Sequence, residues 1–292
     1  MPASIGPRRS VLFLPGSNPR AIEKARTLPA DALIFDLEDA VAPSAKEAAR
    51  AGVAAALAAG GYGKRELVLR VNSLDTAWGE ADLAAAARMP LDAVLLPKIE
   101  DPARVHRSLD LLGAHGAPAG LALWCMIETP LGVLAAPQIA GASPRLAALV
   151  VGTSDLAKDL RIRETRDRLP LLTVLGLVVL AARAHGRAVL DGVHLDLADA
   201  LGFAAACRQG SELGFDGKTL IHPDQIAPAN AAFSPLPEEV ARAGRLIAAY
   251  REASAAGKGA ARIEGRLVEA LHVEEAERTL ALAAAIAARE GG

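Results

Sequence analysis

Charged side chains follow a series of short apolar runs in this sequence. The first clear case is Ala32–Phe35, an apolar run that leads directly into the acids Asp36, Glu38 and Asp39. A buried parallel strand has this pattern when it carries reactive groups at its carboxyl end. The pattern recurs along the chain, and the polar residues that close such runs include Glu38, Asp39, Arg70, Lys98, Glu128, Asp155, Asp191 and His222. We expect these eight side chains to converge at one opening.

The residue types at these positions indicate a site for a hard divalent cation. Several carboxylates and an arginine are present without a set of cysteine and histidine ligands, and magnesium prefers oxygen ligands. Glu128 and Asp155 are the expected metal ligands, because each is the first acid after a fully apolar strand in neighbouring units. Glu38 and Asp39 are then expected behind them, holding metal-bound water or the guanidinium of Arg70.

The elements that position these residues alternate between strand and helix. Eight strands are expected, and each is followed by a helical pattern: Ser10–Leu14, Asp31–Leu37, Glu66–Val71, Ala93–Leu96, Leu121–Ile127, Leu146–Val151, Arg187–Leu190 and Lys218–Ile221. Eight such units close a parallel barrel, so the predicted fold is an α/β (β/α)8 barrel. A doubly wound open sheet is the alternative. It would need a glycine-rich phosphate loop after the first strand, and the sequence PGSNP does not match that pattern.

The sequence also predicts how the chain is divided. Residues 1–256 are assigned to the barrel, with a last barrel helix near Pro237–Ser254. Residues 257–292 exceed what a barrel needs, and they are expected to form a lid or an oligomer contact. Within this segment we expect a connector at Gly257–Arg262, a short hairpin at Ile263–Val268 and a helix at Val273–Ala288.

Composition excludes several classes of function. The formal net charge of −2 and the near-neutral pI give no basis for nucleic-acid binding. Two cysteines cannot form a disulfide framework, which fits a reducing compartment. The N-terminal apolar run stops too early for a signal peptide, and the apolar segment Leu171–Ala182 is too short to span a bilayer. The sequence therefore predicts a cytoplasmic protein that is not inserted in a membrane.

The same positions carry a resemblance to a known family. The chain resembles the citrate lyase beta-subunit and malyl-CoA lyase family in seven ordered motifs that cover essentially the whole barrel: RSVLFLPGSNPR, DALIFDLEDAVAPSAKEAAR, LRVN, LLPKIE, IETPLGVL, VGTSDLAKDL and GFDGKTLIHPDQI. The resemblance implies a (β/α)8 barrel, trimeric or hexameric, that uses Mg²⁺ to break or form a C–C bond in a 3-hydroxyacyl thioester. The acyl carrier is coenzyme A or an acyl carrier protein.

The resemblance also implies roles for particular residues. It makes Glu128 of the IET motif and Asp155 of the GTSD motif the metal ligands, with Glu128 also contacting substrate. It places Arg70 of the RVN motif on the keto-acid oxygens. Basic residues after the first strand contact the coenzyme A phosphates in relatives, which makes Lys24 and Arg20 candidates. The implied reaction is a retro-Claisen cleavage in which Arg70 offsets the oxyanion charge.

One motif departs from the family pattern. In the lyases, an aspartate in a motif like GxMID reaches from a neighbouring subunit's lid and acts as the acid/base. Here the corresponding run is GRLVE, so the position holds Glu269. A glutamate is one methylene longer, and a shift of about 1 Å in a catalytic group can cost roughly 10²-fold in rate. The departure leaves open a slower lyase, another substrate or a change towards hydrolysis.

Other readings of these residues and of the function remain open at this point. Glu38 and Asp39 also suit the first turn of a helix, and Glu128 and Asp155 taken singly suit N-caps or ion pairs. Glu269 also suits a solvated surface acid. The alternative functions are a malyl-CoA-type thioesterase, a citrate lyase beta subunit that acts on an acyl-carrier-protein thioester within a complex, and an aldolase of free acids.

Overall fold

The computed structural model describes residues 6–255, 261–263 and 266–290. The chain divides into two compact units. One unit is Arg8–Phe233, and the other combines Met1–Pro7 with Ser234–Gly292. All the strand-end residues named above belong to the first unit, whereas Glu269 belongs to the second.

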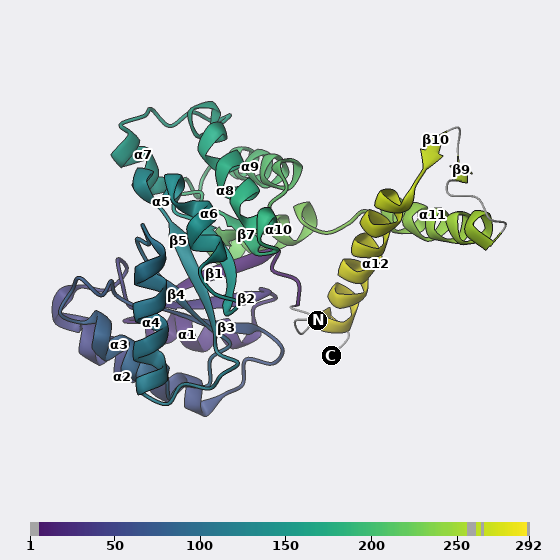
Figure 1. The fold of residues 1–292 in the computed structure, drawn as a ribbon. Helices are drawn as coiled ribbons and strands as arrows, with labels where there is room; N and C mark the ends of the chain where they lie inside the picture. The colour runs from purple at the N-terminus through teal and green to yellow at the C-terminus, as the bar shows by residue number, and fades with distance from the viewer. Residues whose placement is uncertain (1–5, 256–260, 264–265, 291–292) are drawn as a thin grey trace. The chain divides into compact units, whose positions relative to one another are not determined.

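The first unit is a closed parallel barrel, as the sequence predicts (Figure 1). Neighbouring strands pair in chain order, and β1 pairs with β8 to close the barrel. Because all strands are parallel, their carboxyl ends lie at one mouth. The strands are β1 (Ser10–Pro15), β2 (Ala32–Asp36), β3 (Glu66–Arg70), β4 (Ala93–Leu96), β5 (Ala122–Ile127), β6 (Leu146–Val151), β7 (Ala188–Asp191) and β8 (Gly217–Leu220).

Helices connect successive strands around the outside of the barrel (Figure 1). The α-helices of this unit are α1 (Pro19–Lys24), α2 (Lys46–Ala59), α3 (Gly79–Ala86), α4 (Pro102–Ala114), α5 (Pro130–Leu134), α6 (Ala136–Gly141), α7 (Thr153–Leu160), α8 (Leu172–Ala184), α9 (Ala200–Leu213) and α10 (Ile226–Ala232). Four 3-10 helices accompany them: η1 (Ala25–Thr27), η2 (Pro43–Ala45), η3 (Leu169–Leu171) and η4 (Pro223–Gln225).

Side chains along each strand alternate between the barrel interior and the layer under the helices. Ile34 and Trp124 belong to the interior cluster, whereas their neighbours Phe35 and Cys125 pack in the outer layer. This alternation follows from the period of two residues in a strand. The alternation decides which strand-end residues face the mouth and which face the helices.

The C-terminal unit contains two long helices and a hairpin. The helices are α11 (Pro237–Ala255) and α12 (Ala270–Glu290), and the antiparallel pair is β9 (Ala261–Ile263) with β10 (Arg266–Val268). Ala243 and Ile247 of α11 form an apolar cluster with Ala276 of α12.

The assignment of α11 as the last barrel helix was wrong. The helix that follows β8 is the shorter α10, and α11 packs against α12 in the C-terminal unit. An antiparallel pair is present near the expected hairpin, but it begins at Ala261, and residues 264–265 between its strands lie outside the described residues. Residues 257–260 of the expected connector also lie outside them. Within the part of the chain that the structure describes, no helix is both long and apolar enough to cross a membrane.

Candidate active site

A cavity of about 370 Å³ opens among residues at the carboxyl ends of the strands. Its wall combines charged side chains with apolar ones. The charged residues are Asp36, Asp39, Arg70, Glu128 and Asp155, and the apolar residues include Phe13, Met126, Val151, Val193 and Ile221. The structure therefore brings the two expected metal ligands and the expected substrate arginine to one cavity.

Arg70 is held in a fixed orientation by Asp36. Its Nε donates to Asp36 Oδ1 at 2.6 Å and its Nη2 donates to Asp36 Oδ2 at 2.7 Å. The guanidinium also lies over the ring of Phe13, 4.9 Å from the centroid. Burial opposes the charge on Arg70, but the hydrogen bonds and the charge of Asp36 outweigh it and raise the pKa of the guanidinium. Arg70 is therefore a permanent, oriented cation in the cavity wall.

Asp36 was missed as a site residue in the sequence. The acid lies on β2 directly opposite Arg70 in the strand register, and it shares its side of the strand with the interior residues Ala32 and Ile34. Alternation along the strand is the signal that could have found it. Its oxygens also accept the backbone N–H groups of Glu38 and Ala40, so Asp36 shapes the loop that follows β2.

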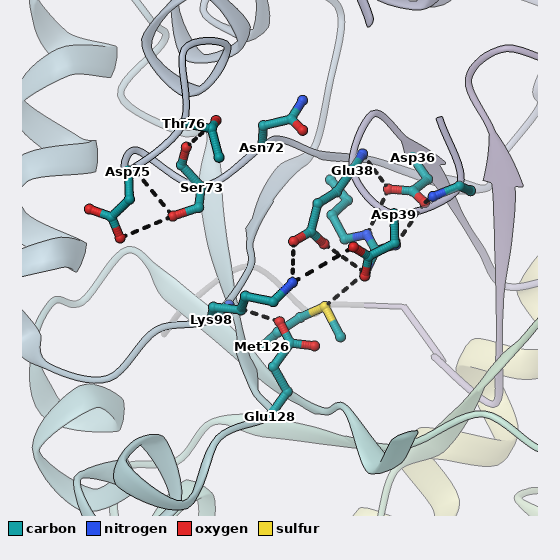
Figure 2. Close-up of polar contacts among 12 residues, drawn as sticks. Asp36, Glu38, Asp39, Asn72, Ser73, Asp75, Thr76, Lys98, Met126 and Glu128 are labelled. Atoms are coloured by element: carbon teal, nitrogen blue, oxygen red, sulfur yellow. Dashed lines mark hydrogen bonds and ion pairs between the residues drawn. The ribbon is translucent and has the colours of Figure 1, made fainter. Parts of the chain in front are cut away.

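Glu38 lies between two cations. Its Oε1 accepts from Lys98 Nζ at 2.6 Å (Figure 2). Its Oε2 lies 3.0 Å from Arg70 Nη1, close enough for an ion pair although not aligned for a hydrogen bond. Burial raises the pKa of Glu38, while the charges of Arg70 and Lys98 act in the opposite direction. Asp39 is more exposed and lies 3.7 Å from Arg70 Nη1. Both acids thus contact Arg70.

Glu128 is a deeply buried carboxyl group of the cavity wall. Its Oε1 accepts the backbone N–H of Lys98 at 2.8 Å (Figure 2). A Cβ on Gly152 would lie 2.3 Å from Glu128 Cβ, so only glycine leaves room for this side chain. Burial, followed by repulsion from Glu38, raises the pKa of Glu128 to about 8. At neutral pH the group is therefore largely protonated until a cation compensates its charge.

Asp155 lies on a helix that the sequence reading did not predict. The helix α7 begins at Thr153, directly after β6, and Asp155 is in its first turn. An acid in the first turn is favoured by the positive end of the helix dipole. The sequence TSDLAKDL contains this signal, because small polar residues and an acid precede a helical pattern.

The donor set fits a magnesium ion. Two carboxylates, Glu128 and Asp155, line the same cavity, and magnesium is commonly held by one or two carboxylates with water and substrate oxygens. The raised pKa of Glu128 is the expected condition of a buried acid whose counter-charge is a cation. No group of three or more His, Cys, Asp or Glu side chains suited to a metal occurs among the described residues. The remaining ligands would therefore come from solvent and substrate.

Four of the eight strand-end residues do not line the cavity, which corrects the expectation for them. Glu38 and Lys98 still contact its wall, through Arg70 and Glu128, whereas Asp191 and His222 have other partners. Asp191 faces the helix layer, where it binds Lys218 Nζ at 2.9 Å and Arg168 Nη1 at 2.7 Å. Its neighbour Leu190 occupies the interior position instead. His222 caps the short helix η4 by accepting the N–H of Asp224. Both residues have structural roles.

The remaining predicted site residues lie outside the cavity wall. Lys24 and Arg20 are exposed on α1, the helix after β1. Glu269 is exposed and directly precedes α12, where its backbone N–H donates to His272 Nδ1 at 3.1 Å. Lys98 contacts Glu38 and Glu128 as described above. The roles of Lys24, Arg20 and Glu269 stay predictions.

A barrel with buried acids and an oriented arginine at its mouth defines an enzyme of the (β/α)8 class. Residues 9–223 match the model of the HpcH/HpaI aldolase/citrate lyase family. The chain belongs to this family, which confirms the resemblance found in the sequence.

Relatives over nearly the full length carry two kinds of name. A (3S)-malyl-CoA thioesterase of Cereibacter sphaeroides strain KD131 is 51% identical over 282 residues, which cover 97% of this chain and 96% of the relative. The citrate lyase subunit beta of Leuconostoc mesenteroides subsp. cremoris is 37% identical, with 94% and 93% covered. The chain is therefore an enzyme of a family whose members include citrate lyase beta subunits and a malyl-CoA thioesterase.

Solved structures of related proteins support the fold. The CitE protein of Mycobacterium tuberculosis in complex with magnesium, acetoacetate and coenzyme A has a TM-score of 0.77 and 32% identity, with 96% of this chain and 99% of that chain covered. A citrate lyase beta subunit from M. tuberculosis, complexed with oxaloacetate and magnesium, has a TM-score of 0.65 and 32% identity, with 80% and 98% covered. Magnesium is thus present in structures of this family.

Proposed function

We propose that the protein is a Mg²⁺-dependent thioesterase that hydrolyses a malyl-CoA-type 3-hydroxyacyl thioester to the hydroxy acid and coenzyme A. The main support is the 51% identity with a (3S)-malyl-CoA thioesterase over 97% of the chain. Relatives named as citrate lyase beta subunits are more distant, at 36–37% identity. The cavity chemistry fits this reaction, because thioester hydrolysis needs a stabilised oxyanion and an activated water molecule.

Each residue of the site has a role in the proposed hydrolysis. Glu128 and Asp155 would hold the magnesium ion, which when bound supplies Lewis-acid polarisation of substrate oxygens. Arg70, fixed by Asp36, places positive charge where the oxyanion develops. Glu269 takes the proton of the attacking water as general base. A C–O bond forms at the acyl carbon, the C–S bond breaks, and the thiolate leaves to be protonated by solvent.

Carbon–carbon cleavage is the second candidate. The CitE structure with magnesium, acetoacetate and coenzyme A favours it, because that protein resembles this chain over 96% of its length. The same residues serve this reaction if Glu269 removes the proton of the substrate hydroxyl group instead of a water proton. The C–C bond then breaks to a keto acid and an acyl thioester. The position of Glu269 relative to the bound substrate therefore decides between thioester hydrolysis and C–C cleavage.

The assembly and the carrier are part of the proposal. Glu269 lies outside the barrel unit, so we propose that the C-terminal unit acts as a lid on the site of a neighbouring copy within a trimer or hexamer. Lys24 and Arg20 are exposed cations on α1 that suit the coenzyme A phosphates. An acyl carrier protein bears the same phosphopantetheine thioester and is the alternative carrier.

The product set tests the proposed function. The enzyme is incubated with (3S)-malyl-CoA and Mg²⁺ in ¹⁸O-enriched water, and products are identified by mass spectrometry. Hydrolysis yields free coenzyme A and malate with one ¹⁸O in the newly formed carboxyl group. Formation of glyoxylate and acetyl-CoA without labelled malate would overturn the thioesterase proposal and support the lyase. Activity only on the acyl-carrier-protein thioester would support a complex-bound subunit.

A further inference from the structure

Lys98 occupies a backbone conformation that favours glycine. Its φ angle is 49°, in the left-handed region, and only Arg161 and Arg168 share this feature among the described non-glycine residues. A side chain with a Cβ costs conformational energy there, and glycine would avoid that cost. Strained residues of this kind cluster at functional sites, where the surrounding structure holds them in place. Both the backbone and the side chain of Lys98 contact acids of the site.

The backbone of Lys98 orients Glu128. The left-handed turn after β4 directs the Lys98 N–H to Glu128 Oε1, at 2.8 Å. The second oxygen, Oε2, accepts no hydrogen bond from the described residues, and it lies beside Gly152 in the cavity wall. One oxygen of Glu128 is thus occupied by the protein and the other remains for a ligand.

The side chain of Lys98 neutralises a competing acid. Its Nζ lies 2.6 Å from Glu38 Oε1 and 3.8 Å from Asp39 Oδ1 (Figure 2). Glu38 is buried, and the same lysine joins it to Glu128, because the Lys98 amine binds Glu38 and the Lys98 backbone N–H binds Glu128. Without Lys98, Glu38 would keep Arg70 as the partner of Oε2, and its Oε1 would lose its cation. A divalent cation would then have an alternative pair of ligands, Glu38 with Glu128.

We propose that Lys98 is a positioning residue that selects the ligand pair of the divalent cation. By binding Glu38 through its amine and Glu128 Oε1 through its backbone, it withholds Glu38 from the cation and leaves Glu128 Oε2 together with Asp155. This inference rests on the proposed function, because it concerns the metal of that site. It goes beyond that function by assigning the choice of coordination to a residue that touches neither metal nor substrate.

Mn²⁺ binding tests this proposal without reliance on turnover. Mn²⁺ alone is titrated into wild type, Asp155→Ala, Lys98→Met and the double variant, and free ion is measured by electron paramagnetic resonance. In the wild-type background, Asp155→Ala should weaken Mn²⁺ binding by about 10- to 100-fold. In the Lys98→Met background, the fold-loss of Mn²⁺ affinity caused by Asp155→Ala should be less than a third of the loss in the wild-type background, because Glu38 replaces Asp155 as a ligand. Equal losses in both backgrounds would overturn the role of Lys98.

Turnover provides the second readout. Lys98→Met should bind Mn²⁺ at least as tightly as wild type and yet lose about 10- to 100-fold in kcat, because the cation is displaced from Asp155. Adding Glu38→Gln should recover most of the lost kcat, and Lys98→Arg should keep it. Lys98→Gly should lose kcat as Lys98→Met does without loss of thermal stability, since it relieves the strained backbone.

The results distinguish failure of the proposed role of Lys98 from failure of the proposed metal site. A merely structural role for Lys98 predicts a parallel loss of thermal stability and Mn²⁺ affinity in Lys98→Met, with no recovery from Glu38→Gln, and this result would overturn the inference alone. A wild-type protein that binds no Mn²⁺ at millimolar concentration would overturn the proposed metal site, and the inference with it.

Discussion

Asp36 and Arg70 form a two-bond ion pair in the wall of the cavity, with N–O distances of 2.6 and 2.7 Å. Both side chains are buried, so removal of the acid takes both hydrogen bonds from a buried guanidinium and leaves it only the ion pairs with Glu38 and Asp39. Asp36→Ala should therefore lower the free energy of unfolding by about 3–5 kcal/mol. Urea unfolding measures this loss. The matched control is Glu80→Ala, which removes the partner of Arg107 in an exposed pair and should cost about 0–1 kcal/mol. Equal effects of the two changes would contradict the account of this pair.

Gly152 should be intolerant of even a single methyl group. A Cβ at this position would lie 2.5 Å from Glu128 Oε2, so Gly152→Ala must displace the carboxyl group. We expect a loss of about 10²-fold in kcat/KM, because a shift of about 1 Å at a reacting group has effects of this size. The control is Gly176→Ala in α8, where the added methyl group meets no atom within 4 Å. Wild-type activity in Gly152→Ala would show that the position of Glu128 is not critical.

Cation binding should release a proton at neutral pH. Glu128 has a pKa of about 8 in the metal-free protein, so below pH 8 the proton and the cation compete for the same carboxyl group. The affinity for Mg²⁺ should rise by about tenfold per pH unit below pH 8 and level off above it. Calorimetric titration at pH 7 in two buffers with different ionisation enthalpies should count about one proton released. A pH-independent affinity between pH 6 and 8 would contradict the raised pKa.

Glu269 should affect turnover much more than metal binding. Glu269→Gln keeps the size of the side chain and removes the base, so kcat should fall by about 10²–10⁴-fold with Mg²⁺ affinity unchanged. Mixing Glu269→Gln with Glu128→Gln, each inactive alone, should restore part of the activity if the lid acts on a neighbouring copy. Mixed oligomers without any recovered activity would argue for a lid that serves its own barrel. Unchanged turnover in Glu269→Gln would point to a different base.

The barrel could be predicted from sequence because its strands are short, mostly apolar and separated by helical patterns. An apolar run does not show which of its side chains face the barrel interior and which face the helices. In β7, the run Ala188–Leu190 gives no sign of which residues face inward, so Asp191 was wrongly placed at the mouth although it binds Lys218 under the helices. Asp36 was missed for the converse reason: it directly follows Phe35, and only the strand alternation places it opposite Arg70.

The C-terminal unit was harder to predict than the barrel. The segment of α11 has the pattern of an ordinary amphipathic helix and directly follows eight regular units, so it was assigned to the barrel. The deciding factor is tertiary: the apolar side chains of α11 pack against Ala276 of α12, a contact between segments separated by the hairpin. The shorter α10 fills the position after β8 instead. No local propensity distinguishes these two arrangements.

The position of the cation is the most direct test of the central claim, that Glu128 and Asp155 hold a divalent metal in the cavity. Crystals of the protein soaked in Mn²⁺ can be measured at the manganese absorption edge. We predict one anomalous peak within about 2.0–2.3 Å of an oxygen of both Glu128 and Asp155, absent from crystals of Glu128→Ala. A peak elsewhere, or no peak in wild type at saturating Mn²⁺, would contradict the proposed site.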